Sequence, residues 1–109
     1  MKEIEWLGSS LKDLQALKTD LKRRMGFELD TIQRGFQPSD FKPMSSVGSG
    51  VNEIRVMGED GIARCFYATK YEDRVLVIHV FEKKTQKTSQ ADIELGRKRL
   101  AAYLKELKK

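Results

Sequence analysis

Hydrophobic residues in the first third of the chain recur every three or four positions, the spacing of helices with one buried face. Before them, Ile4 and Trp6 alternate with polar residues and favour a short first strand over residues 2–7. Ser10 is suited to cap a helix, and Gly35 follows the last turn of the pattern. We therefore expect two helices, or one helix bent at Gly26, ending at Gly35. The residues of the pattern are Leu11, Leu14, Leu17, Leu21, Met25, Phe27, Leu29, Ile32 and Phe36.

A loop follows at residues 37–50, and beyond it the hydrophobic period changes to that of strands. Three segments rich in Val, Ile, Phe and Tyr are separated by turn sequences and predict a three-stranded antiparallel meander. Ser89 then caps a last amphipathic helix. These elements predict a single α+β domain over residues 1–109, with helices packed on one face of a small antiparallel sheet. The strand segments are residues 52–57, 62–70 and 74–82.

The last strand has one fully aliphatic face, which we expect to meet the helices. Arg55, Arg64 and His79 form a polar cluster if all three lie on the opposite, uncovered face, and the edge of this cluster meets Lys83 and Lys84. A slip of one residue in strand register would reverse every assignment. The aliphatic face consists of Leu76, Ile78 and Val80.

The charge distribution changes what this cluster can bind. The chain of 109 residues has a net charge of +5, and residues 82–109 account for all of it, with nine Lys and Arg against four Asp and Glu. Such an imbalance at one end indicates an anionic partner, most simply nucleic acid or an acidic protein segment. A solubilising C-terminal helix is the competing explanation.

Composition also argues against several classes of protein. Cys65 is the single cysteine, so an internal disulfide and a thiolate metal cluster are excluded. No apolar run approaches the roughly 18 residues of a membrane span, and the N-terminus lacks the pattern of a signal peptide. We expect a cytoplasmic protein without a metal or cofactor.

Four segments resemble the RelE/ParE toxin superfamily, and within it the HigB-like, phage-derived branch. They are residues 53–55, 64–67, 77–85 and 92–94, and the most specific piece runs from Phe81 through Thr88. Many members have Ala where Gly96 stands in this chain. The resemblance implies a RelE-like fold and the toxin of a type II toxin–antitoxin pair.

HigB-like toxins cleave messenger RNA in the ribosomal decoding site and are held inactive in a complex with a helix-turn-helix antitoxin. The resemblance therefore implies messenger RNA, the ribosome and a cognate antitoxin as partners. ParE-like relatives share the fold but inhibit DNA gyrase, and a phage-derived nucleic-acid-binding module without catalysis is a further alternative.

A ribonuclease of this type needs only to align the RNA 2′-hydroxyl with the adjacent phosphate, move protons and neutralise charge. His79 is the only histidine, so a two-histidine acid–base pair is impossible and Lys and Arg must carry most of the work. Arg55 and Arg64 match family arginines and are candidates to hold phosphate oxygens. The alternative for each is a structural ion pair.

Lys83 and Lys84 are adjacent cations, and mutual repulsion favours the neutral form of one of them. We expect a general base or a pair of electrostatic clamps here, against the alternative of a solvated strand end. His79 is a candidate acid, base or stacking platform, although a lone strand histidine is more often a hydrogen-bonded core residue. The predicted RNA-binding residues are Lys70, Phe81 and Lys87.

Overall fold

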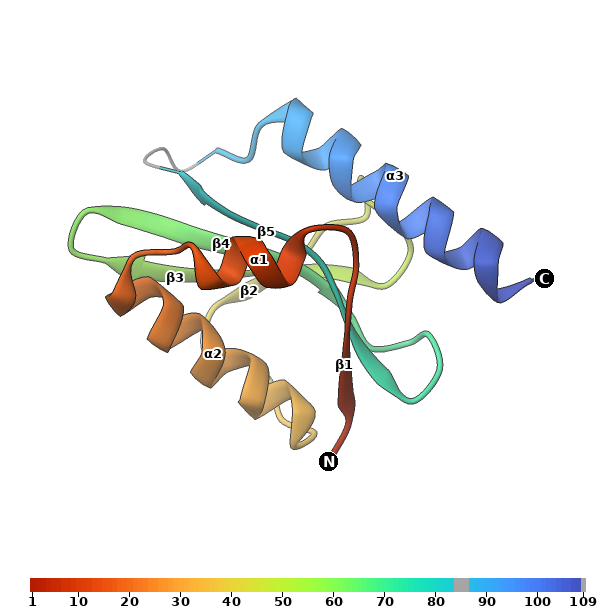
Figure 1. The fold of residues 1–109 in the computed structure, drawn as a ribbon, viewed down its shortest axis with the longest axis horizontal. Helices are drawn as coiled ribbons and strands as arrows, with labels where there is room; N and C mark the ends of the chain where they lie inside the picture. The colour runs from red at the N-terminus through yellow and green to blue at the C-terminus, as the bar shows by residue number, and fades with distance from the viewer. Residues whose placement is uncertain (84–86, 109) are drawn as a thin grey trace.

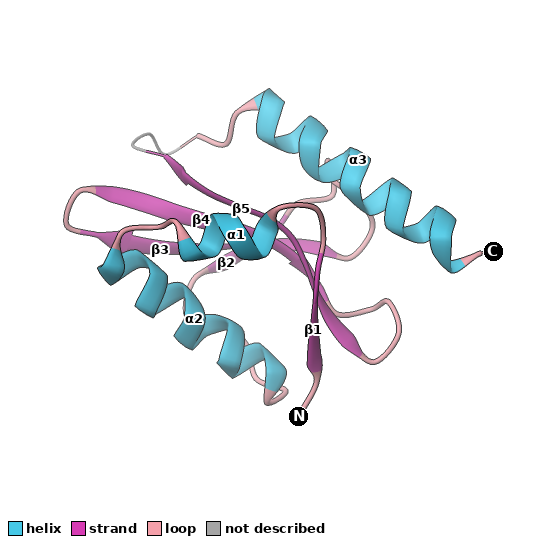
Figure 2. Ribbon diagram, in the orientation of Figure 1, coloured by secondary structure: helices cyan, strands magenta, loops and turns pink. Residues whose placement is uncertain are grey.

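The computed structural model describes residues 1–83 and 87–108 as an α+β fold with a five-stranded sheet and three helices (Figures 1 and 2). The strands are β1 (Glu3–Trp6), β2 (Phe41–Pro43), β3 (Val51–Gly58), β4 (Gly61–Ala68) and β5 (Arg74–Lys83). The helices are α1 (Ser10–Gln15), α2 (Thr19–Gln33) and α3 (Gln90–Leu107).

The sheet is mixed, which differs from the purely antiparallel sheet predicted from sequence. Its strand order is β1-β5-β4-β3-β2, and β1 pairs with β5 in parallel while the other three pairs are antiparallel. The predicted meander corresponds to β3, β4 and β5, which form the centre of the sheet. The short first strand is also present as β1. β2 lies inside the segment predicted to be a loop. It was not predicted because its three residues are exposed and show no alternation of apolar and polar positions.

Two helices follow β1, as the first of the two alternatives proposed. The break falls at Ala16–Lys18 and not at Gly26, which lies inside α2. α2 ends at Gln33, and Gly35 adopts a left-handed φ of 91° just beyond it. Glycine tolerates this conformation without a steric penalty, which explains why the helix stops here.

Helices cover both faces of the sheet, so the prediction that they share one face is wrong. α2 packs on one face against side chains that include Ile54, Cys65 and Val77. On the opposite face, Leu100 of α3 packs with Phe66, Leu76 and Ile78. In Figure 1, α2 and α3 accordingly lie on opposite sides of the strands. The prediction failed because β5 is apolar on both faces, the pattern of a strand buried on both sides.

An extra residue in β5 reverses the facing of the end of that strand. Phe66 pairs with His79 and Tyr67 with Val77, so the ladder passes over Ile78. Val80 therefore joins Val77 in the core under α2, which corrects the prediction that Leu76, Ile78 and Val80 share one face. His79 faces α3. The prediction that His79 lies on an uncovered face of the sheet is therefore wrong, because α3 covers that face.

Within residues 1–83 and 87–108, no helix combines the length and hydropathy needed to span a membrane.

Two helical glycines predict opposite effects on stability. A Cβ at Gly96 would lie 2.9 Å from Cδ2 of the buried Phe66 ring, whereas a Cβ at Gly26 would meet nothing within 4 Å. Replacing a glycine inside a helix by alanine gains about 1 kcal/mol of helix propensity. Overpacking a core costs about 1–3 kcal/mol. We expect Gly26→Ala to raise the free energy of unfolding in urea and Gly96→Ala to lower it; an increase for both would show that Phe66 yields freely.

Candidate functional site

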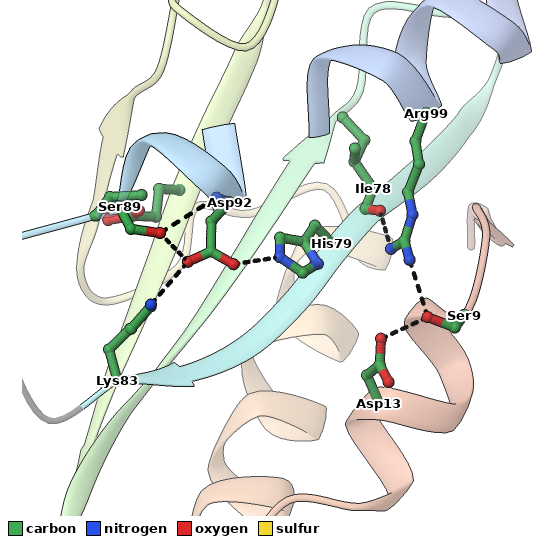
Figure 3. Close-up of polar contacts among 10 residues, drawn as sticks. Ser9, Asp13, Ile78, His79, Lys83, Ser89, Asp92 and Arg99 are labelled. Carbon is green, nitrogen blue, oxygen red and sulfur yellow. Dashed lines mark hydrogen bonds and ion pairs between the residues drawn. The ribbon is translucent and has the colours of Figure 1, made fainter. Parts of the chain in front are cut away.

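Four polar side chains meet where the end of β5 approaches the start of α3 (Figure 3). Oδ1 of Asp92 lies 2.8 Å from Nε2 of His79, and Oδ2 lies 3.2 Å from Nζ of Lys83. The hydroxyl of Ser89 donates to Oδ2 and also accepts the backbone N–H of Asp92, capping α3. Asp92 thus holds a base and a cation at one carboxylate, an arrangement we call the Asp92 cluster (His79, Lys83, Ser89 and Asp92).

Burial and hydrogen bonding together set the protonation states of His79 and Asp92 in the Asp92 cluster. Burial lowers the pKa of His79, and this effect exceeds the opposing effect of the hydrogen bond with Asp92. Burial alone would raise the pKa of Asp92, but hydrogen bonds from Ser89, His79 and Lys83 reverse the effect and lower it. At neutral pH the cluster therefore contains an ionised Asp92 carboxylate and a neutral His79 imidazole.

His79 presents only one nitrogen to a hydrogen-bonding partner. A carboxylate only accepts hydrogen bonds, so Nε2 carries the proton and Nδ1 the lone pair. Nδ1 is buried and has no hydrogen-bond partner among the described residues. The ring stacks on Phe81, with centroids 4.5 Å apart, and both rings contact Phe66. The aromatic contacts fix the imidazole plane and bring Phe81 beside the cluster.

Arg64 lies in the interior next to this cluster. Its Nη1 donates to Oε1 of Glu53 at 2.9 Å and to the hydroxyl of Thr88 at 3.3 Å, and Thr88 donates to Oε2 of Glu53. The Arg64 and Glu53 side chains are fully buried, and Lys42 approaches Glu53 to 3.9 Å from the surface. This geometry is that of the structural ion pair named as the alternative for Arg64.

Arg55 lies directly across the ladder from Arg64 but reaches the surface. Its Nε is 3.4 Å from Oδ2 of Asp40, and its side chain is 30% exposed. The register thus places Arg55, Arg64 and Phe81 in one row across β3, β4 and β5. The structure brings the predicted arginines and His79 onto one face, and only Arg55 of these three is substantially exposed.

The remaining predicted residues divide by position. Lys87 is exposed and lies one residue before Thr88. Lys70 lies beyond the opposite end of β4 from Lys83, where it donates to Ser49 and sits over the ring of Tyr71. Lys84 lies outside the described residues.

Sequence reasoning did not name Asp92 as a site residue. The signal was present, because the spacing of Ser89 and Asp92 is that of a helix cap, but capping alone explained both residues. The contact with His79 and Lys83 depends on how β5 and α3 are brought together. Glu53 and Thr88 were likewise unpredictable as partners of Arg64, since they come from distant parts of the chain.

In the described part of the chain, no group of three or more His, Cys, Asp or Glu residues is placed to hold a metal ion. Cys65 is fully buried, and burial raises the pKa of its thiol, so this cysteine is a core residue.

A protein-family model matches most of the chain. Residues 12–101 match a family described as "Phage derived protein Gp49-like (DUF891)". No curated protein matches the chain.

The Asp92 cluster makes stability depend on pH. The folded-state pKa of His79 lies below its ordinary value of 6.5, so the unfolded chain binds the extra proton first as pH falls. Its contribution to stability is present above about pH 6.5 and is lost as pH falls through the folded-state pKa. We expect the melting temperature to fall between about pH 7 and 5, with a smaller fall in His79→Gln; equal slopes would contradict a neutral, buried His79.

The buried ion pair with Glu53 makes Arg64 important for the stability of the fold, whatever its role in function. Removing one partner of a buried ion pair costs about 3–5 kcal/mol because the other charge is left unpaired. We expect Arg64→Ala to lower the free energy of unfolding by that amount, and Glu53→Gln combined with Arg64→Met to recover much of it. Urea denaturation of both variants measures the difference; a small loss in Arg64→Ala would show that Glu53 finds another partner.

Proposed function

The chain belongs to the Gp49-like family of phage-derived proteins, and from this premise we propose that it is a toxin that cleaves messenger RNA on the ribosome. The family is associated with RelE-like toxins. The Asp92 cluster carries the proposal, because it holds a partly exposed lysine beside a stacked aromatic pair at the most basic end of the chain. In this proposal the protein is of the HigB-like type and acts in the cytoplasm.

Lys83 is the residue best placed to meet the scissile phosphate. Its side chain is 34% exposed, and the bond to Asp92 limits the directions in which the ammonium points. An oriented cation near the phosphate stabilises the charge that develops as the 2′-hydroxyl attacks. Lys84 in the next position and the exposed Lys87 supply further charge for the RNA backbone. We assign Lys83 the role of electrostatic clamp.

The other predicted residues support this lysine in different ways. Phe81 is half-buried, and its outer part is available for a base to stack on. Arg55 is exposed enough to contact a phosphate of the same strand. His79 is 6% exposed and Arg64 is fully buried, so we assign them positioning roles: His79 holds Asp92 and Phe81, and Arg64 holds the Thr88 segment.

The burial of His79 and Arg64 also favours a second candidate function. Of the five residues predicted to be catalytic, these two do not reach the surface. A module that binds RNA through the lysines and Phe81 without cutting it would need neither side chain exposed. The two functions share the same surface, and only product formation separates them.

The partners follow from the proposed activity. A toxin of this type acts on messenger RNA and the ribosome and is neutralised by a cognate helix-turn-helix antitoxin in a toxin–antitoxin complex. A neighbouring reading frame for such a protein is the expected genetic context.

Lys83 variants test the proposed activity directly. Purified protein is added to translating ribosomes, and messenger RNA ends are mapped. We expect cleavage by the unaltered protein, a loss of at least about 100-fold in Lys83→Ala, and retention of most activity in Lys83→Arg, because the clamp requires charge and not proton transfer. Lys22→Ala, an exposed lysine of α2 that donates to a backbone carbonyl, is the matched control and should cleave normally.

The competing functions give different results in the same experiment. Intact messenger RNA with tight ribosome or RNA binding would indicate the non-catalytic module. Intact messenger RNA together with inhibited DNA supercoiling would indicate a gyrase inhibitor. Loss of activity in Lys83→Arg as well as Lys83→Ala would instead assign proton transfer to Lys83.

A further inference from the structure

Arginines and an exposed aromatic ring share a concave surface between α2 and the edge of β3. This groove has a volume of about 520 Å³, which lies within the roughly 300–1,000 Å³ of small-molecule sites. Phe27 of α2 is 66% exposed although its side chain is large and apolar. An exposed ring in a concave surface is a common feature of ligand-binding sites. The residues that line the groove include Arg23, Arg24, Phe27, Asp40, Arg55 and Met57.

Two exposed arginines of α2 stand next to this ring. Arg23 and Arg24 precede Phe27 by four and three residues, so the three side chains are neighbours on the helix surface. Nη1 of Arg24 donates to the carbonyl oxygen of Met57 at 3.1 Å. Arg23 makes no hydrogen bond or ion pair with residues 1–83 or 87–108. A guanidinium can hold two phosphate oxygens through parallel N–H donors, so these arginines are suited to bind an anion.

The two carboxylates of the groove differ in what they can still bind. Both oxygens of Glu28 accept hydrogen bonds from Ser39, one from its backbone N–H at 2.7 Å and one from its hydroxyl at 2.9 Å. Asp40 uses Oδ2 to bind Nε of Arg55 at 3.4 Å, and its side chain is 50% exposed. Oδ1 of Asp40 accepts no hydrogen bond from the described part of the chain. This oxygen is therefore an acceptor for a hydroxyl or amino group of a ligand.

These groups complement the three parts of a nucleotide. We propose that the groove binds one nucleotide, with its base on the ring of Phe27, its phosphate on Arg23 and Arg24, and a ribose hydroxyl on Oδ1 of Asp40. Stacking on one ring accepts any base, because every base presents an aromatic face. The hydroxyl contact favours ribose over deoxyribose. An acidic peptide would also match the arginines, but its carboxylates cannot donate a hydrogen bond to Asp40.

Arg55 connects the groove to the surface around Lys83. It lines the groove, and it lies in the row of Phe81, two residues before Lys83, so Arg55 and Lys83 share one face of the sheet. Met57 pairs with Ile62, and Ile62 pairs with Lys83, which puts the backbones of Met57 and Lys83 about 10 Å apart. The nucleotide can therefore be a free molecule or one unit of an RNA strand that continues to Lys83. Its assignment to an RNA substrate rests on the proposed function, whereas nucleotide binding itself does not.

Titration with adenosine 5′-monophosphate (AMP), followed through the backbone amide signals in NMR spectra, tests the nucleotide site. We expect signals of α2 around Phe27 and of β3 around Arg55 to shift. The Kd should rise at least about fivefold in Phe27→Ala, which loses the stacking surface, and at least about tenfold in Arg23→Ala, which loses charged hydrogen bonds. Phe36→Ala and Arg34→Ala are the matched controls and should bind normally, since both residues are exposed and lie outside this groove.

Two further probes separate recognition of a nucleotide from attraction of an anion. Inorganic phosphate should bind at least about fivefold more weakly than AMP, because it has no base to stack on Phe27. Deoxyadenosine 5′-monophosphate should also bind about fivefold more weakly, because it lacks one hydroxyl donor, and this difference should disappear in Asp40→Ala. Equal binding of the two nucleotides to the unaltered protein would overturn the role of Asp40.

A single-stranded RNA hexamer distinguishes the two sources of the nucleotide. If the nucleotide belongs to a strand that reaches Lys83, the hexamer should bind at least tenfold more tightly than AMP, and both Phe27→Ala and Lys83→Ala should weaken it. If the groove serves a free nucleotide, the hexamer should bind no more tightly than AMP, and Lys83→Ala should change nothing. These assays contain no ribosomes, so AMP bound in the groove of a protein that leaves messenger RNA intact would refute cleavage and not this site.

The proposal fails if AMP shifts no signal at the groove or if Phe27→Ala binds AMP as well as the unaltered protein does. It also fails if inorganic phosphate or a hexaglutamate peptide binds there as tightly as AMP, since the groove would then be a general anion site or a surface for acidic proteins. Thermal unfolding of each variant checks that these substitutions of exposed residues leave the fold intact.

Discussion

The single extra residue in β5 determines which side chains of this strand face α2 and which face α3. Up to Val77, the odd-numbered residues of β5 face α2; beyond Ile78 the order is reversed, so that Val80 faces α2 while His79 and Phe81 face α3. Without that reversal Lys83 and His79 would lie under α2, away from Asp92. A bulge breaks a ladder locally, and here Nη1 of Arg99 compensates by donating to the carbonyl oxygen of Ile78 at 3.0 Å. Arg99 also reaches Ser9, which ties α3 to the start of α1 (Figure 3).

The Asp92 cluster then follows from the packing of α3. Leu100 and the glycine at 96 bring the helix close to Phe66, and the Ser89 cap fixes where the helix begins. Asp92 in the first turn is consequently held against β5 and not in solvent. A carboxylate at a helix N-terminus is stabilised by the helix dipole, and this one also receives His79 and Lys83.

The basic charge is divided between two regions with different surroundings. On the α3 side, lysines near the Asp92 cluster form the surface assigned to RNA. At the β3 edge, arginines stand beside exposed apolar side chains and two carboxylates.

The amino-acid pattern determined the α+β class, the three central strands and the last helix, because periodicities of about 3.6 and 2 residues follow from local backbone geometry. It left open whether one or two helices precede the strands. It also determined the basic end of the chain and Ser89 as a helix cap. The tertiary structure alone decided that helices cover both faces, that β1 joins β5 in parallel, and that a short edge strand lies within the predicted loop. It also decided that Arg64 is buried with Glu53 and Thr88, and that His79 and Lys83 share Asp92. These features depend on contacts between residues far apart in the chain and on one inserted residue, and neither leaves a periodic trace in the sequence.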